Sequence, residues 1–172
     1  MGNHDGKRYF LAELHMGNMR RHRMFIRKVK IHNFKCYRDF EITLEEGLNI
    51  VVGDNEAGKS TILEAINLAL TGIISGKSIW NEISQYIFNK EAVDEYIVSL
   101  GTAPIALPYI TIEIFFGGDE NPLMNGDANS DRDNSAEGFC FKIAFNDKYA
   151  DEYEALVPVS YTHLTLPTNS RV

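Results

Sequence analysis

Cysteine is scarce in this chain of 172 residues. The two that occur, Cys36 and Cys140, have neither a metal-binding spacing nor neighbours that suggest a redox pair, so we interpret them as free thiols of a reducing cytoplasm. Long apolar runs are also missing, because none reaches the length of a membrane span and the first residues lack a signal-peptide core. We therefore expect a cytoplasmic protein without a membrane partner.

An excess of positive charge is absent as well. The net charge is −7, so the chain as a whole is not a basic protein that wraps nucleic acid. Basic residues nevertheless crowd residues 20–30, and carboxylates dominate from Asp119 to Glu154. We interpret the basic segment as a solvated strand face, with phosphate contact as the alternative. The length suffices for one domain.

The two ends do not have the pattern of a fold. Residues 1–23 show no sustained period, which predicts that translation starts at Met24; a short arm is the alternative. Near the other end, "VSYTHLTLPT" resembles the translation of a transposase sequencing adapter. We therefore expect residues 158–172 to be adapter-derived and the native part, residues 24–157, to be truncated.

Between these ends, the apolar residues predict three strands before a glycine-rich loop. The first two have a half-buried, alternating pattern, and the third, "LNIVV" at residues 48–52, is continuously apolar, as a strand covered on both faces would be. The residues predicted to face the core are Phe25, Val29 and Ile31 in the first strand and Phe40, Ile42 and Leu44 in the second.

Helical and strand patterns follow the loop. "KSTILEAINLALTG" predicts a helix that ends near Gly72. Its predicted buried side consists of Ile62, Leu63, Ile66, Ala69 and Leu70. A second helix is predicted over residues 93–100, and alternation predicts strands at 110–116 and 139–145. The predicted helical stripe consists of Val93, Tyr96, Ile97 and Leu100.

The loop "GDNEAGKST", from Gly53 to Thr61, matches the phosphate-binding pattern G-x-x-x-x-G-K-[ST]. Its context is also right, because a predicted strand precedes it and a predicted helix follows. Glycines let backbone amides approach phosphate oxygens, and the helix adds the positive end of its dipole. The pattern therefore predicts a site for a nucleoside triphosphate with Mg²⁺.

Each residue of the loop has an expected role. Lys59 is predicted to reach the β- and γ-phosphates and is the candidate catalytic residue, the Ser60 hydroxyl is the candidate Mg²⁺ ligand, and Thr61 is expected to hold the α-phosphate. The predicted nucleotide-binding residues of the loop are Gly53, Asp54, Asn55, Glu56, Ala57, Gly58, Lys59, Ser60 and Thr61.

The segment "IHNFKCYRDFEITLEEGLNIVVGDNEAGKSTILEAINLAL" resembles the amino-terminal ATPase segment of the SMC, RecF and OLD (overcoming lysogenisation defect) proteins. The resemblance covers about forty residues. It implies an α/β fold: the N-terminal part of an ABC-type P-loop ATPase head, with a mixed sheet around the P-loop helix and an antiparallel β lobe. It also implies ATP as cofactor, with Lys35, Tyr37 and Arg38 contacting its base or ribose. A solvated turn is the alternative for these three.

Two later segments, "YIFNKEAVDEYIVSLGTAPIALPYITIEIFF" and "KIAFNDKYADEYEAL", resemble the OLD-like endonucleases more than the SMC proteins. This resemblance implies a parent ATPase and endonuclease that acts on DNA in repair or phage defence, with a second ATPase head as partner in a homodimer. The alternatives are a RecF- or SMC-type DNA-binding ATPase without nuclease activity and, less favoured, a transporter ATPase subunit. We find no acidic Walker B strand or "SGG" signature after Ser60, so we expect this chain alone to bind nucleotide without hydrolysing it.

Overall fold

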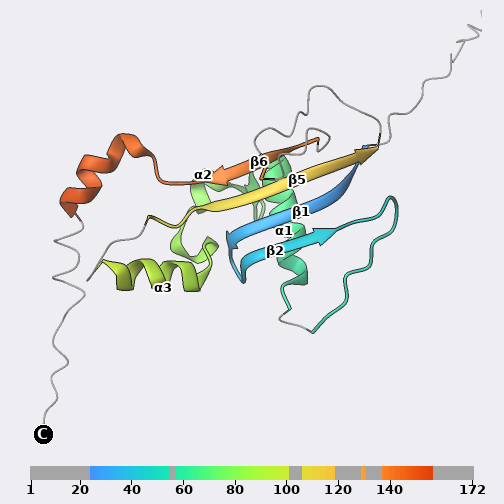
Figure 1. Ribbon diagram of the computed structural model, residues 1–172, viewed down its shortest axis with the longest axis horizontal. Helices are drawn as coiled ribbons and strands as arrows, with labels where there is room; N and C mark the ends of the chain where they lie inside the picture. The colour runs from blue at the N-terminus through green and yellow to red at the C-terminus, as the bar shows by residue number, and fades with distance from the viewer. Residues whose placement is uncertain (1–23, 55–56, 101–105, 119–128, 131–136, 157–172) are drawn as a thin grey trace, which may run out of the picture.

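The computed structural model describes residues 24–54, 57–100, 106–118, 129–130 and 137–156 (Figure 1). In chain order its elements are β1 (Met24–Phe34), β2 (Tyr37–Thr43), α1 (Lys59–Thr71), β3 (Ile73–Ile74), β4 (Lys77–Ser78), α2 (Ile79–Glu82), η1 (Gln85–Ile87), α3 (Lys90–Ser99), β5 (Ile110–Gly118), β6 (Gly138–Ile143) and η2 (Asp147–Tyr149). Residues 150–156 are helical. The predicted leader, 1–23, and the predicted tail, 158–172, lie outside the described residues, so both assignments stay predictions.

The main sheet has four strands in the order β2-β1-β5-β6, and every neighbouring pair is antiparallel. On one face, Val29 and Ile31 of β1 pair with Ile114 and Ile112 of β5, and all four are almost fully buried. Phe25 was predicted on this face and is not there. The register shifts between Ile26 and Lys28, and this irregularity places Ile26 against the core instead.

Helix α1 lies across the apolar face of the sheet, against β1 and β5 (Figure 1). The side chains that it buries there are Ile62, Ala65, Leu68 and Ala69. The predicted helix is confirmed, but its predicted buried side is wrong at Leu63 and Leu70, which are 70% and 50% exposed. Gly72 ends the helix in a left-handed conformation, as predicted.

The predicted second helix and the two strands after it are confirmed with changed bounds or faces. Helix α3 buries Ala92, Tyr96 and Ser99. Its buried side therefore differs from the predicted one, and Ile97 is exposed. Strand β6 stops at Ile143, two residues before the predicted end. The fold is thus a mixed α/β arrangement with an antiparallel sheet, and none of the described helices is long and apolar enough to cross a membrane.

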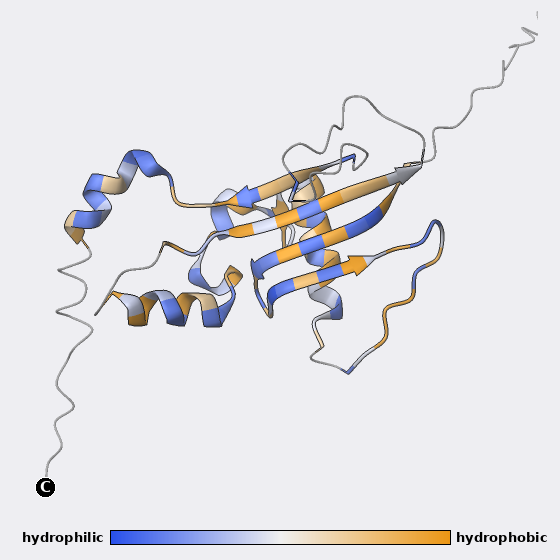
Figure 2. Ribbon diagram, viewed as in Figure 1, coloured by the Kyte–Doolittle hydropathy of each residue, from blue (hydrophilic) through white to orange (hydrophobic). Residues whose placement is uncertain are grey.

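The predicted third strand is wrong. Residues 48–52 have no regular secondary structure and leave the sheet as a loop after β2, which Figure 2 shows with apolar residues along it. Leu48, Ile50 and Val52 are 86%, 75% and 84% exposed. An apolar run becomes a buried strand only where neighbouring strands supply hydrogen-bond partners on its edges, and no described strand does so here.

The contrast between two leucines of α1 gives a direct test of the core. We expect Leu68→Ala, at a fully buried side chain, to lower the free energy of unfolding by about 2–5 kcal/mol, because it removes transfer free energy and leaves a cavity. Leu63→Ala, in the same helix but 70% exposed, should cost less than about 0.5 kcal/mol. Urea denaturation measures both, and equal costs would contradict the described packing.

The loop at residues 48–52 has its own test. Its backbone lacks ladder partners, whereas β1 is paired on both sides, so its amides should exchange hydrogen at least about tenfold faster than those of residues 29–32. Hydrogen exchange followed by mass spectrometry measures the two segments in one sample. Equal protection would indicate that residues 48–52 form a strand after all.

Candidate phosphate-binding loop

Helix α1 begins directly after Gly58, whose backbone conformation only glycine adopts without strain. Gly58, its N-cap residue, has φ 81° in the left-handed region. The amides of Thr61 and Ile62 bond to the Gly58 carbonyl, and no described side chain caps this end of the helix. The amides of Lys59 and Ser60 and the positive end of the helix dipole are therefore available to an anion.

Lys59 folds back over the loop that precedes it. Its Nζ donates to the carbonyl oxygen of Gly53, at 2.5 Å, and to that of Asp54. Both partners are neutral carbonyls, so these contacts hold the ammonium at the loop without neutralising its charge. A phosphate oxygen is a stronger partner for an ammonium than a carbonyl. The arrangement thus offers a positioned cation beside uncapped helical amides.

The turn between β1 and β2 covers this loop from one side. The Tyr37 hydroxyl donates to the Ala57 carbonyl at 3.3 Å, and Cys36 Sγ lies 3.7 Å from Thr61 Oγ1. A Cβ atom added at Gly58 would lie 2.7 Å from Tyr37 Oη and 2.8 Å from Cys36 Sγ. Burial, with a smaller contribution from Cys36, raises the pKa of the Tyr37 hydroxyl, so this group remains a donor at neutral pH.

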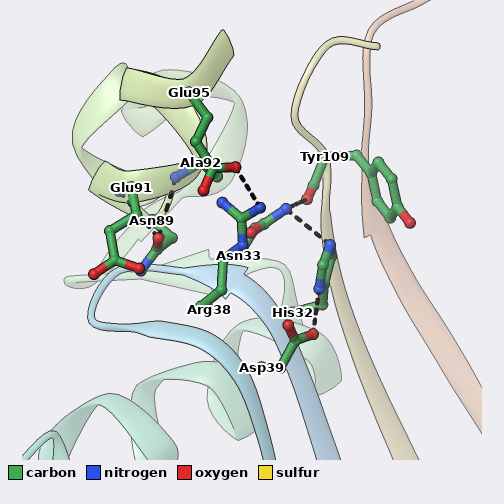
Figure 3. A network of polar contacts seen from close by, with 9 residues as sticks. All are labelled: His32, Asn33, Arg38, Asp39, Asn89, Glu91, Ala92, Glu95 and Tyr109. Carbon is green, nitrogen blue, oxygen red and sulfur yellow. Dashed lines mark hydrogen bonds and ion pairs between the residues drawn. The ribbon is translucent and has the colours of Figure 1, made fainter. Parts of the chain in front are cut away.

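The three residues predicted to contact base or ribose do not lie together. Lys35 and Tyr37 reach the loop and α1, since Lys35 Nζ lies 2.5 Å from Glu64 Oε2 in the second turn of α1. Arg38 points the other way, and its Nη2 pairs with Glu95 Oε2 of α3 at 2.7 Å (Figure 3). In this arrangement Arg38 links two elements of the fold and faces away from the loop.

The remaining predicted site residues have no contact that tests their roles. Asn55 and Glu56 lie outside the described residues. Ser60 is exposed in the first turn of α1, where its hydroxyl is free to meet a cation brought by phosphates. Among the described residues, no three His, Cys, Asp or Glu side chains are grouped closely enough to hold a metal ion. A Mg²⁺ ion would therefore need phosphate oxygens as ligands besides Ser60.

A polar cleft of about 420 Å³ opens on the sheet face opposite α1. Its buried carboxylate, Glu113, accepts from the backbone amide and the hydroxyl of Ser130. His32 pairs with Asp39 at 2.6 Å. Lys30 lines the cleft as well, and its Nζ donates to Ser130 Oγ at 3.1 Å and lies 3.6 Å from Glu41 Oε2, so the polar groups of the cleft bond to one another.

Two residues near the site were given no role by the sequence patterns. The thiol of Cys36 sits over Gly58, and the side chain of Asn89 reaches the β1–β2 turn from the start of α3. An asparagine just before a helical pattern is a signal for a helix cap, and that signal is present at Asn89. No sequence signal indicates its contact with a turn 54 residues away.

The left-handed glycines at the two ends of α1 form a matched pair. Gly72→Ala meets no atom within 4 Å and should cost only the conformational penalty, roughly 1–2 kcal/mol. Gly58→Ala carries the same penalty and also collides with Tyr37 and Cys36, so it should cost at least about 1 kcal/mol more. Urea unfolding compares the two variants, and equal costs would mean that the turn does not pack on Gly58.

The curated relatives each match about a quarter of this chain. A DNA double-strand break repair Rad50 ATPase of Methanopyrus kandleri is 53% identical over 45 residues, which is 26% of this chain and 5% of that protein. The DNA replication and repair protein RecF of Gloeobacter violaceus is 45% identical over 49 residues, 28% of this chain and 13% of that protein. Structural maintenance of chromosomes protein 6 of Saccharomyces cerevisiae is 48% identical over 46 residues, 27% and 4% of the two chains.

The matched segment is thus a small part of each of these relatives. Among solved structures, one of the recombination mediator protein RecF with ATP aligns with 70% of this chain and 24% of its own, with a TM-score of 0.44 and 17% identity. A sequence model of a protein family, described as "AAA domain", matches residues 28–153, which is well over half of the chain. The phosphate loop and all of the sheet except the first residues of β1 lie within this range, and the chain belongs to the AAA domain family.

Proposed function

We propose that this chain binds ATP, together with Mg²⁺, at the loop from Gly53 to Thr61. One observation carries the proposal: the Lys59 ammonium is held at the loop by neutral carbonyls, beside a helix N-terminus that no described side chain caps. An ammonium and backbone amides that converge on one point are suited to a polyphosphate. When bound, Mg²⁺ would supply charge neutralisation between phosphate oxygens, with the Ser60 hydroxyl as its ligand from this chain.

Each residue has a defined task in this proposal. Gly58 keeps the space under the turn free of a Cβ atom, and Lys59 exchanges its carbonyl partners for phosphate oxygens. Lys35 and Tyr37, which lie beside the loop, are the candidates for contact with the nucleoside. Arg38 stays a candidate for the same contact, for which it would have to leave its ion pair with Glu95 of α3.

We further propose that the chain is part of an ATPase that acts on DNA. The support is the names of the relatives, which are a double-strand break repair ATPase, a replication and repair protein and a chromosome maintenance protein. These names are consistent with a RecF- or SMC-type ATPase. The OLD-like endonuclease, which the resemblance at residues 86–116 and 142–156 implies, stays a prediction. A second copy of the ATPase head as partner stays a prediction as well.

Nucleotide titration tests the central proposal. We expect the chain to bind a fluorescent ATP analogue in the presence of Mg²⁺, and Lys59→Ala to weaken binding about 10- to 100-fold, because one charge-assisted contact to phosphate is lost. Lys77→Ala is the matched control, since Lys77 is an exposed lysine of β4 that forms an ion pair with Glu82. Its affinity should equal that of the unsubstituted chain.

Fluorescence anisotropy gives the dissociation constants, and far-UV circular dichroism verifies that each variant keeps its helices. Identical affinities for the unsubstituted chain and Lys59→Ala would refute the assignment of the loop.

A further inference from the structure

The β1–β2 turn, which covers the phosphate loop on one side, is fastened on its other side by residues 87–89. The amide of Lys35 donates to the Ile87 carbonyl at 2.9 Å, and the amide of Asn89 donates to the Asn33 carbonyl at 2.9 Å. Phe34 and Phe88 form an isolated antiparallel bridge. The turn is therefore sandwiched between the phosphate loop and the segment that leads into α3.

This turn has a backbone conformation that depends on outside support. Asn33 and Lys35 have φ values of 54° and 49°, in the left-handed region that residues other than glycine rarely adopt. Asparagine tolerates this region better than lysine does, so Lys35 is the more strained of the two. Conformations of this kind persist only when surrounding contacts hold them.

Asn89 supplies the contact that ties this turn to α3. Its side chain is almost fully buried, at 5% exposure. The side-chain oxygen caps α3 by accepting from the amides of Glu91 and Ala92, and the side-chain nitrogen donates to the Lys35 carbonyl at 3.0 Å. One amide group thus caps a helix with its acceptor and holds the strained turn with its donor.

Neighbouring polar contacts also join the β1–β2 region to the elements around it (Figure 3). Asn33 Nδ2 donates to the Tyr109 carbonyl at 3.1 Å and lies 2.8 Å from His32 Nε2. The ion pair between Arg38 and Glu95 links β2 to the second turn of α3. The start of α3 and the turn therefore form one polar cluster, whose far side contacts the phosphate loop through Tyr37 and Cys36.

We propose that Asn89 is a positioning residue for the nucleotide site: its side-chain N–H holds the β1–β2 turn against the phosphate loop, and this contact couples α3 to nucleotide affinity. The inference rests on the proposed nucleotide function. Because coupling between two sites is reciprocal, nucleotide at the loop also stabilises the start of α3. A perturbation at α3 then changes the affinity for ATP without touching the nucleotide.

The substitution Asn89→Asp separates the two roles of the side chain. Aspartate caps helices as well as asparagine does, so α3 keeps its cap. It removes the N–H donor, however, and sets a carboxylate against the Lys35 carbonyl. We expect ATP affinity, measured as in the Lys59 experiment, to fall about fivefold or more. Asn146→Asp is the matched control, because Asn146 caps η2 in the same way and does not contact the turn.

A double-mutant cycle with Lys35→Gly tests whether the effect runs through the turn. Glycine adopts a positive φ without strain, so in the Lys35→Gly background Asn89→Asp should change affinity less than about twofold. A residue that merely caps α3 would show no coupling to position 35. Equal losses in the two backgrounds, or no loss in either, would overturn the positioning role even if the unsubstituted chain binds ATP.

Hydrogen exchange separates this inference from the nucleotide assignment, since it needs no ligand. In the free chain, exchange in residues 33–37 should be faster in Asn89→Asp than in the unsubstituted chain by about fivefold or more, and unchanged in Asn146→Asp. If neither the unsubstituted chain nor any variant binds ATP but this difference in exchange is present, the proposed function is wrong. The role of Asn89 in holding the turn is then still supported. Unchanged exchange in Asn89→Asp would show that the Asn89 side chain does not hold the β1–β2 turn.

Discussion

The packing of α1 on the sheet determines the geometry of everything around the loop. Ala65 and Leu68 have no exposed surface and meet a layer of fully buried isoleucines on β1 and β5. Burial of one large aliphatic side chain contributes about 1.5–3 kcal/mol, more than the roughly 1 kcal/mol of an ordinary hydrogen bond. Apolar packing therefore fixes where α1 begins, and the weaker polar contacts of the turn only adjust what lies over Gly58.

Motifs of residues close together in the sequence could be predicted, whereas contacts between residues far apart in the sequence could not. The glycine loop, the lysine after it and the helix that ends at Gly72 follow from residue types at fixed spacing, and the structure has α1 with left-handed glycines at both ends. The ion pair of Arg38 with Glu95 joins residues 57 positions apart, and no periodicity indicates such a contact. The irregularity near Ile26 moved Phe25 off the core for a similar reason, because it depends on the pairing with β5.

The incorrect predictions at Leu63, Leu70 and residues 48–52 share one cause. Apolar patterning indicates that a surface is suited to burial, but it does not say which segment covers it. In the described part of the chain, α1 has one apolar side against the sheet and further apolar residues toward solvent, and the run at 48–52 has no neighbouring strand. The outer side of α1 mixes these apolar residues with exposed polar ones such as Ser60 and Asn67, so the apolar pattern alone did not identify the side that packs on the sheet.

The carbonyl partners of Lys59 have a thermodynamic consequence. Lys59 already has two hydrogen-bond partners in the loop, so in the proposed function a triphosphate would replace these existing bonds. The free energy of that exchange is the difference between the ammonium bonded to phosphate oxygens and the ammonium bonded to carbonyl oxygens. Its sign depends on how far the attraction to the phosphate charge exceeds the attraction to the carbonyl dipoles. Added salt screens the first of these terms far more than the second, so the proposed exchange becomes less favourable as ionic strength rises.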